Sequence, residues 1–381
     1  MIYFDNSATT RVDSDIALVA AEAMTKNFGN PSSLHYVGVQ AYQALNVARN
    51  QIAKMWGAKT NCIVFTSGGT ESNNLAIQGG AAANLSTGKH VVTTAIEHSS
   101  VLGACGVLEK QGYQVTYVRP DPVTGCIRAE DFVNAVNQET ALVSCMEVNS
   151  ETGELLPIKE IIQGVRRKNP NTRIHVDCVQ GFGKIPFKVY EYDADFLSAS
   201  SHKIHGPKGI GALYLSDRLV QAFQPPYLGG EQERGLRPGT ENLPYAMGLA
   251  AAATRLAGSI RSRDKAVRAL NDRLRAGLSI FPEVEINSPA GAVPEVLNFS
   301  ENCIKSETML AWLSEKQIYV SSASACGRGQ PSHTLAAMGR DPLAIDTAIR
   351  VSFCADNTPE DVDAFLERFE DGMKHLQRIR K

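Results

Sequence analysis

The chain has 381 residues, of which 43% are hydrophobic and 20% charged, and this length allows about two domains. A formal net charge of −2 gives no electrostatic reason to expect binding to nucleic acid or membranes. The N-terminus lacks a basic segment followed by an apolar core, and the most apolar helical stretch, 246–257, is too short to span a bilayer. We therefore expect a cytoplasmic protein.

From about residue 62 onward, short runs of strand character alternate with helical patterns. The predicted strands are 62–66, 90–96, 114–119, 141–148, 173–179, 194–200 and 211–215. The predicted helices between them include 72–84, 99–110, 129–137 and 158–168. This alternation is typical of an α/β domain in which helices cover a mostly parallel sheet, here of seven strands.

After about residue 243 the pattern changes to a long helical stretch that runs toward residue 278. A second α/β set follows, with strands and helices at 296–299, 307–316, 318–321 and from Pro359. We expect a large domain formed by residues 15–255 and a smaller α/β domain formed by residues 1–14 and 256–381.

Lys203 lies in an unusual place for a lysine, directly after the predicted strand 194–200 and among serines and histidines. The glycines of segment 206–211 then turn the chain sharply into the next strand. A lysine in a loop is most often an ordinary surface residue. An amine held at the end of a strand is also a candidate Schiff-base nucleophile. The residues that follow the neighbouring strands distinguish between these two interpretations.

Other polar groups follow neighbouring strands, at the edge where an open α/β sheet binds its ligands. Segment 67–72, Ser-Gly-Gly-Thr-Glu-Ser, opens a helix and suits one phosphate, although it matches neither a P-loop nor a dinucleotide fingerprint. His98 begins the next helix, and Asp177 lies among apolar residues, where an unpaired carboxylate is costly. Each feature alone has a structural explanation, as a cap or an ion pair. Together they match the needs of pyridoxal phosphate (PLP): an imine-forming amine, a phosphate site, an anion for the pyridinium and a group that covers the ring.

The eight cysteines include no C-x-x-C pair, so neither a zinc ribbon nor a thioredoxin-like site is expected. Most of them lie in apolar runs and are expected to be buried. Cys326 differs, because it lies in the Ser- and Gly-rich segment 321–331 close to Arg328. It is a candidate reactive thiol, with an inert loop cysteine as the alternative.

These features resemble the cysteine desulfurase family, within class V of the fold-type-I PLP enzymes. The matching segments extend over almost the whole chain: 3–10, 29–35, 66–75, 97–98, 175–177, 201–203, 206–209, 229–235, 237–242 and 321–326. The last segment is similar to the subgroup with the pattern Ser-Ser-x-Ser-Ala-Cys. The resemblance implies a fold-type-I PLP-dependent transferase whose smaller C-terminal domain carries the catalytic cysteine loop.

The resemblance implies a role for each matching residue. Lys203, Cys326 and His98 would be catalytic, with Lys203 holding PLP as a Schiff base and Thr240 reaching the phosphate of the neighbouring subunit in a homodimer. The implied cofactor-binding residues are Gly69, Thr70, His98, Asp177, Gln180, Ser200, His202, Lys203 and Thr240. The implied substrate-binding residues are Arg350, Asn149, Ser150 and Asn30. No resident metal is implied, and Cys326 is a candidate transient ligand of an iron–sulfur cluster.

The implied reaction removes sulfur from L-cysteine, with L-alanine as product and a persulfide on Cys326 for a sulfur-acceptor protein. An iron–sulfur scaffold and a tRNA-thiolation enzyme are both candidate acceptors. On the same scaffold, a selenocysteine lyase or a class V aminotransferase is the alternative, and the aminotransferase gives Cys326 no role. A non-catalytic sulfur carrier or scaffold protein is the alternative of a different class.

Three departures from the family pattern affect the site. Ser150 stands where the family usually has the second asparagine of Val-Asn-Asn-Glu-x-Gly. The loop after Cys326 is shorter than in the long-loop subgroup, and Ala323 replaces a frequent glycine. Cys354 adds a second thiol where Ser-Leu-Gly is usual. The shorter loop favours an acceptor that brings its own thiol close to Cys326.

Overall fold

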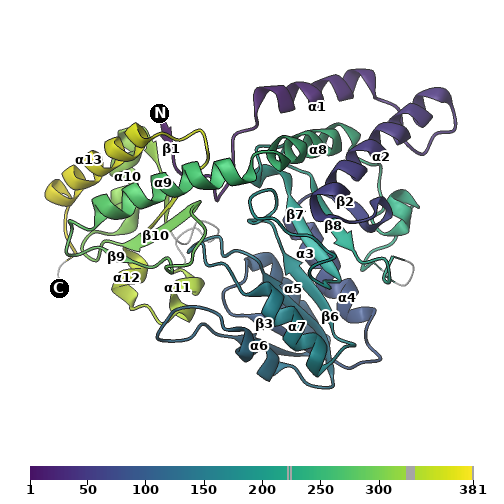
Figure 1. The fold of residues 1–381 in the computed structure, drawn as a ribbon, viewed down its shortest axis with the longest axis horizontal. Helices are drawn as coiled ribbons and strands as arrows, with labels where there is room; N and C mark the ends of the chain where they lie inside the picture. Colours follow the sequence, from purple (N-terminus) through teal and green to yellow (C-terminus); the bar gives the residue numbers. More distant parts are fainter. Residues whose placement is uncertain (221–222, 224, 323–330, 380–381) are drawn as a thin grey trace.

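The computed structural model describes residues 1–220, 223, 225–322 and 331–379, which form two lobes (Figure 1). The larger lobe contains a sheet whose described strands run in the order β2-β8-β7-β6-β5-β3-β4. The strands are β2 (Ile63–Thr66), β3 (His90–Thr94), β4 (Gln114–Val118), β5 (Thr140–Met146), β6 (Arg173–Asp177), β7 (Phe196–Ser200) and β8 (Gly211–Leu215). All neighbouring pairs are parallel except the two that involve β8, so the predicted mostly parallel sheet is confirmed.

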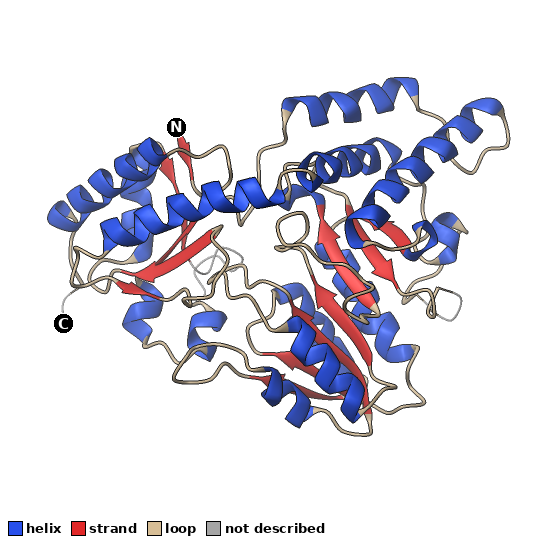
Figure 2. Cartoon of the chain, in the orientation of Figure 1, coloured by secondary structure: helices blue, strands red, loops and turns tan. Residues whose placement is uncertain are grey.

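Helices lie on both faces of this sheet (Figure 2), which explains why five of its strands are buried at every residue. The helices of this lobe are α1 (Ser14–Lys26), which packs on α8, and α2 (Tyr36–Trp56), α3 (Gly69–Asn74), α4 (Gly80–Ala82), α5 (Ser99–Lys110), α6 (Ala129–Ala135), α7 (Ile158–Lys168) and α8 (Leu243–Ala257). The helix predicted at 72–84 begins three residues earlier, at Gly69, and its segment Leu75–Gly79, between α3 and α4, is π-helical.

The smaller lobe contains an antiparallel sheet of order β12-β13-β10-β9 and the parallel pair β1-β11. Its strands are β1 (Ile2–Tyr3), β9 (Glu285–Ile286), β10 (Val296–Ser300), β11 (Ile318–Tyr319), β12 (Ser321–Ser322) and β13 (Ala348–Ser352). Its helices are α9 (Ile260–Leu278), α10 (Ser306–Glu315), α11 (His333–Ala337), α12 (Pro342–Asp346) and α13 (Pro359–His375). The domain boundaries stay a prediction, which the pairing of the N-terminal β1 with β11 supports.

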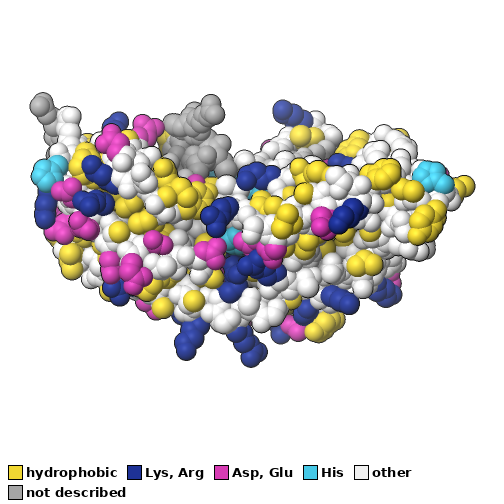
Figure 3. Space-filling view, turned by 90° about the horizontal axis from the view of Figure 1, so that it is seen from above, with side chains coloured by type: hydrophobic (Ala, Val, Ile, Leu, Met, Phe, Trp, Pro, Cys, Tyr) yellow, Lys and Arg dark blue, Asp and Glu magenta, His cyan; other side chains and the backbone are white. Residues whose placement is uncertain are grey.

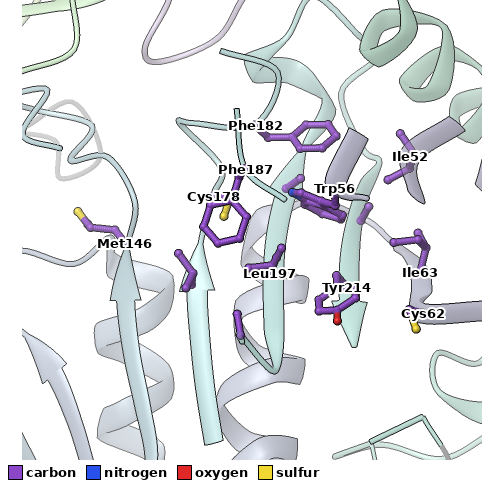
Figure 4. Packing of buried hydrophobic residues seen from close by; sticks show 14 of the residues in the cluster. Ile52, Trp56, Cys62, Ile63, Met146, Cys178, Phe182, Phe187, Leu197 and Tyr214 are labelled. Carbon is purple, nitrogen blue, oxygen red and sulfur yellow. The ribbon is translucent and has the colours of Figure 1, made fainter. Parts of the chain in front are cut away.

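The helical stretch predicted from 243 toward 278 is two helices, because α8 ends at Ala257 and α9 begins at Ile260. Buried residues of α8 pack into the core of the larger lobe, around Trp56 and Phe182 (Figure 4). Those of α9 pack with Phe4 and Phe369 in a separate core of the smaller lobe. The break at 258–259 is therefore the point where the chain passes from one hydrophobic core to the other.

None of the described helices combines the length and the apolar character that crossing a membrane requires. Charged side chains of both signs are mixed with hydrophobic ones over the face seen in Figure 3.

Candidate active site

A cavity of about 360 Å³ lies at the carboxyl ends of β5, β6 and β7, as the sequence predicts for an open α/β sheet. Strands β6 and β7 bring Asp177 and Ser200 to it, and β13 of the smaller lobe brings Arg350. Ten of the predicted site residues line this cavity: Gly69, Thr70, His98, Ser150, Asp177, Gln180, Ser200, His202, Lys203 and Arg350.

Lys203 ends a short 3₁₀ helix, Ser201–Lys203, that follows β7 directly. Its Nζ donates hydrogen bonds to the backbone carbonyls of Ser7 (2.5 Å) and Ala8 (2.8 Å). The carbonyl of Ser7 also accepts a hydrogen bond from Gln180 Nε2 at 3.0 Å. The N-terminal segment therefore lines one side of the cavity and contacts the amine.

Asp177 lies at the end of β6 and is only 5% exposed. Its two oxygens accept hydrogen bonds from the Asn73 amide (2.7 Å) and the Val179 backbone N–H (2.9 Å). Burial raises the pKa of this carboxyl above its usual value, while the Val179 N–H, His98 and the Asn73 amide oppose the rise. A buried carboxylate of this kind suits a cationic group in the cavity.

His98 is the N-cap of α5, and its ring Nδ1 accepts the backbone N–H of Ser100 at 3.1 Å. The Ser100 hydroxyl lies 2.8 Å from the same nitrogen. Asn73 and Ser100 both line the cavity, yet the sequence did not single them out. The Asn that follows Thr-Glu-Ser in segment 70–73 is the signal that could have identified Asn73.

The predicted phosphate segment turns sharply from β2 into α3 at Gly68, whose φ of 155° favours glycine. The turn lies tight against the end of β8, because a Cβ at Gly211 would come within 2.7 Å of Gly68 Cα. Thr70 and Ser200 place hydroxyl groups beside this turn. The segment thus combines the start of a helix with hydroxyl donors, which is an arrangement suited to one phosphate group.

His202 lies on the same side and contacts Thr9 Oγ1 through its Nδ1 at 3.2 Å. Burial, followed by the charge of Lys203, lowers the pKa of His202 to about 4. The imidazole is therefore neutral at pH 7 and can serve an anion as a hydrogen-bond donor.

Arg350 also lines the cavity and is only 3% exposed. Its guanidinium donates to Asp5 Oδ1 at 2.8 Å and to the Ser150 carbonyl at 3.1 Å. Its Nε is buried and has no hydrogen-bond partner in the described chain. Ser150 meets this arginine through its backbone oxygen, which also accepts the Ser7 hydroxyl at 2.9 Å.

Three of the predicted site residues that the structure describes do not line this cavity. Asn149 is buried, but its side chain closes the loop that follows β5 by contacts with the backbone of Ile96 and Thr152. Asn30 lies exposed between α1 and α2, and Thr240 lies exposed just before α8. Cys326 lies outside the described residues. Cys354, the second thiol noted in the sequence, is half-buried, and burial raises its pKa, so it is poorly prepared as a nucleophile.

A larger cavity of about 740 Å³ lies between the end of α2 and the start of α9. It holds none of the predicted site residues, whereas Glu147 and Cys178 line it. These two residues directly follow Met146 and Asp177, which line the smaller cavity. Consecutive residues at the ends of β5 and β6 therefore face different cavities, and the chemistry predicted from the sequence gathers in the smaller one.

Buried carboxyl groups around the sheet edge predict a pH-dependent stability. Burial raises the pKa of Glu97 and Glu147 to about 8 each. The folded chain thus holds more protons than the unfolded chain between about pH 4 and pH 8, so the free energy of unfolding falls as the pH rises through this range. We expect Glu147→Gln to reduce this fall by on the order of 1 kcal/mol in urea unfolding of the apoprotein at pH 5.5 and 8.5.

The exposed Glu160 on α7 provides the matched control, because Glu160→Gln should leave the fall with pH unchanged. An equally steep fall in the Glu147→Gln protein would contradict the assignment of this pH dependence to Glu147.

Comparisons with known proteins agree with this geometry. A model of the class-V aminotransferase family matches residues 2–365. The chain belongs to the class-V aminotransferase family. Within it, the chain is 41% identical over 381 residues to the cysteine desulfurase IscS of Methanosarcina thermophila, covering 99% of this chain and 93% of that protein. It is also 40% identical over 384 residues to cysteine desulfurase 2 of Trichormus variabilis, covering 100% of this chain and 94% of that protein.

Solved structures give the same result for this class-V chain. A NifS-like protein superposes with a TM-score of 0.92 at 36% identity, covering 98% of this chain and all of the other. A structure described as SspA in complex with cysteine superposes with a TM-score of 0.82 at 32% identity, covering 93% of this chain and 99% of that one. The predicted fold-type-I architecture and membership of the cysteine desulfurases are therefore confirmed.

Proposed function

We propose that this class-V enzyme is a PLP-dependent cysteine desulfurase that converts L-cysteine to L-alanine and keeps the sulfur as a persulfide on Cys326. The observation that carries the proposal is the meeting of Lys203, Asp177 and Arg350 in one cavity at the carboxyl edge of the sheet. These three side chains supply an amine, a buried anion and a guanidinium from separate parts of the chain. Their meeting in one cavity indicates a binding site for a small charged ligand rather than a structural role.

The residues of the cavity fit PLP. Lys203 would hold it covalently, and the buried Asp177 carboxylate would pair with the pyridine nitrogen. Gln180 would meet the ring oxygen and His98 would cover the ring. The phosphate would lie at the turn into α3, with these residues as ligands: Gly69, Thr70, Ser200 and His202.

The bound cofactor supplies an electron sink for the substrate Cα, which makes its proton easier to remove. The Lys203 amine, which lies at the cavity and contacts the carbonyls of Ser7 and Ala8, then moves that proton. Asp177 stabilises positive charge at its end of the cavity, because its buried carboxylate accepts hydrogen bonds from the neutral Asn73 amide and the Val179 N–H. The N-terminal segment at Ser7 and Ala8 restricts access of water to the amine.

Cys326 would act as the sulfur acceptor. Its thiolate attacks the sulfur of the substrate, so an S–S bond forms while the substrate C–S bond breaks, and the carbon takes up a proton to leave as alanine. His98 is the proton partner that we propose for these steps. The persulfide then passes to a sulfur-acceptor protein, for which an iron–sulfur scaffold and a tRNA-thiolation enzyme are the two candidates.

Arg350 would bind the substrate carboxylate through a two-pronged hydrogen bond. We expect Arg350→Lys to raise KM for L-cysteine roughly tenfold or more, with a smaller change in kcat, because lysine keeps the charge but not the planar fork. The measurement is a steady-state titration with L-cysteine. Arg273→Lys is a matched control, since Arg273 pairs with Asp363 on the surface. An unchanged KM in the Arg350 variant would refute this role.

We propose a homodimer in which Thr240 of one chain reaches the phosphate site of the other. In this chain Thr240 is exposed and outside the cavity. Large apolar side chains are exposed on and between α1 and α2, among them Leu18 (64%), Phe28 (71%) and Leu34 (98%). A patch of this kind is typical of a protein interface. Light scattering should give twice the chain mass of 41.2 kDa, and a monomer would refute the pairing.

We also propose that the enzyme works in the cytoplasm. The seven cysteines that the structure describes are all free thiols, which suits a reducing compartment. A persulfide on Cys326 likewise needs acceptor thiols that stay reduced. Localisation of a tagged full-length chain by fractionation tests this, and recovery in an oxidising compartment would contradict it.

Product analysis tests the proposed function. With L-cysteine as substrate and a thiol reductant present, the PLP-loaded protein should release alanine and sulfide in equal amounts. Conversion of L-cysteine to its keto acid, with the amino group passed to a second keto acid supplied as acceptor, would instead indicate an aminotransferase. A preference for selenocysteine, with alanine and selenide as products, would indicate a selenocysteine lyase. A protein that binds PLP but turns over neither substrate would indicate a non-catalytic carrier.

A further inference from the structure

Asn73 connects two groups of the proposed active site that do not touch each other in the contacts above. It lies on α3 and is 1% exposed. Its Nδ2 donates to Asp177 Oδ2 at 2.7 Å and to Ser100 Oγ at 2.9 Å. Both hydrogens of the amide are therefore used, one toward the carboxylate and the other toward the start of α5.

The direction of these hydrogen bonds is set by chemistry. Reversing the Asn73 amide would turn its Oδ1 toward the Asp177 carboxylate, where two acceptors would repel each other. In the observed orientation Oδ1 has no hydrogen-bond partner in the described chain. Leaving the buried Oδ1 of Asn73 without a hydrogen bond costs free energy. The hydrogen bonds of its Nδ2 must therefore stabilise this orientation of the amide by more than that cost. The bond to a charged carboxylate is the stronger kind of hydrogen bond and supplies that preference.

The second bond of Asn73 determines what Ser100 can do. Because Ser100 Oγ accepts from Asn73, its single hydrogen is free to be donated to His98 Nδ1, which lies 2.8 Å away. The same Nδ1 accepts the backbone N–H of Ser100. A nitrogen that accepts two hydrogen bonds carries no proton, so neutral His98 has its proton on Nε2. In neutral His98, Nε2 is thus the nitrogen that carries the proton.

We propose that Asn73 is a positioning residue that fixes the Asp177 carboxylate and, through Ser100, the His98 ring in one geometry. The inference rests on the proposed function, because it assigns Asp177 to the cofactor and His98 to proton transfer. The hydrogen bond from Asn73 also stabilises the ionised form of Asp177 and opposes the effect of its burial on the pKa. Its loss therefore weakens the anion that the cofactor requires.

Binding of PLP to the apoprotein provides the first test. We expect Asn73→Ala to weaken PLP binding about tenfold, because the Asp177 carboxylate loses a charge-assisted hydrogen bond. Asn73→Asp should weaken it further, since a second carboxylate beside Asp177 repels the first. Asn74→Ala is the matched control, because Asn74 is the neighbour of Asn73 in α3 and its side chain bonds to the Thr70 carbonyl and to Gln78 in the π-helical segment that follows. It should bind PLP like the unchanged chain.

A double-mutant cycle separates positioning from a general structural role. In an Asp177→Asn background, Asn73→Ala should have little further effect on PLP binding, because the carboxylate that it positions is gone. If Asn73 only supported the fold, its replacement would weaken binding by the same factor in both backgrounds, and the inference would be wrong. Thermal unfolding of every variant shows whether each has folded.

Nitrogen NMR of histidine-labelled apoprotein provides a readout that requires no cofactor. The His98 signals are assigned by their loss in His98→Gln. We expect an unprotonated Nδ1 and a protonated Nε2 in the unchanged chain, and a shift of the Nδ1 signal in Asn73→Ala but not in Asn74→Ala. An identical His98 spectrum in Asn73→Ala would overturn the link through Ser100. Failure of the unchanged chain to bind PLP would instead count against the proposed function.

Discussion

Replacing Lys203 by arginine is expected to abolish the formation of alanine from L-cysteine, with a loss of at least about 10³-fold. Arginine is also cationic and has N–H groups that can donate to the carbonyls of Ser7 and Ala8. The N-terminal segment should therefore keep its place beside the cavity. Its guanidinium stays protonated and cannot form an imine or take up the substrate proton. The measurement is alanine released per enzyme over time.

Lys208 offers a matched control, because it lies five residues further along the same segment and is exposed. Lys208→Arg should keep full turnover. Borohydride reduction of the PLP-loaded protein, followed by peptide mapping, should place the cofactor on the peptide that contains Lys203. Turnover that survives in Lys203→Arg would remove the basis for the whole site assignment.

Replacing Cys326 by serine is expected to abolish sulfide release and sulfur transfer while PLP binding is retained. A serine hydroxyl is not ionised near neutral pH and does not accept sulfur, whereas a thiol with a pKa of roughly 8.5 provides a few per cent of thiolate. The measurement combines the visible absorption of the bound cofactor with a sulfide assay in the presence of reductant.

Cys354→Ser provides the control for this variant. Burial raises the pKa of Cys354, and the residue does not line the cavity, so its loss should leave sulfide release unchanged. If sulfide release stopped in Cys354→Ser and persisted in Cys326→Ser, the acceptor thiol would have been assigned to the wrong cysteine.

Most of the large sheet could be predicted from the sequence, because strands buried on both faces form continuous apolar runs. The strand predicted at 211–215 and the helices predicted at 99–110 and 158–168 have the predicted bounds. Helices α1 and α2 were not predicted, although they span Ser14–Lys26 and Tyr36–Trp56. Both carry exposed apolar side chains, which blur the amphipathic pattern by which a surface helix is identified.

The motifs predicted which residue types meet at the site, but not how the chain surrounds them. The carbonyls of Ser7 and Ala8 contact Lys203 although they are almost 200 residues away in sequence, and backbone groups carry no sequence signal. Asn149 shows the opposite effect. The resemblance implies that it binds substrate, which stays a prediction, and in this structure its amide oxygen accepts backbone N–H groups of its own loop, as asparagine often does in turns. Whether a polar side chain bonds to its own loop or to a distant group depends on the folded structure, which a motif does not describe.

A single turnover is the most direct test of the proposed desulfurase activity. The PLP-loaded enzyme is mixed with one equivalent of L-cysteine without reductant, and the products and the intact peptides are analysed by mass spectrometry. We expect one alanine per active site and one additional sulfur atom on the peptide that contains Cys326. Pyruvate and ammonia in place of alanine, or alanine with no sulfur added to Cys326, would contradict the proposed function.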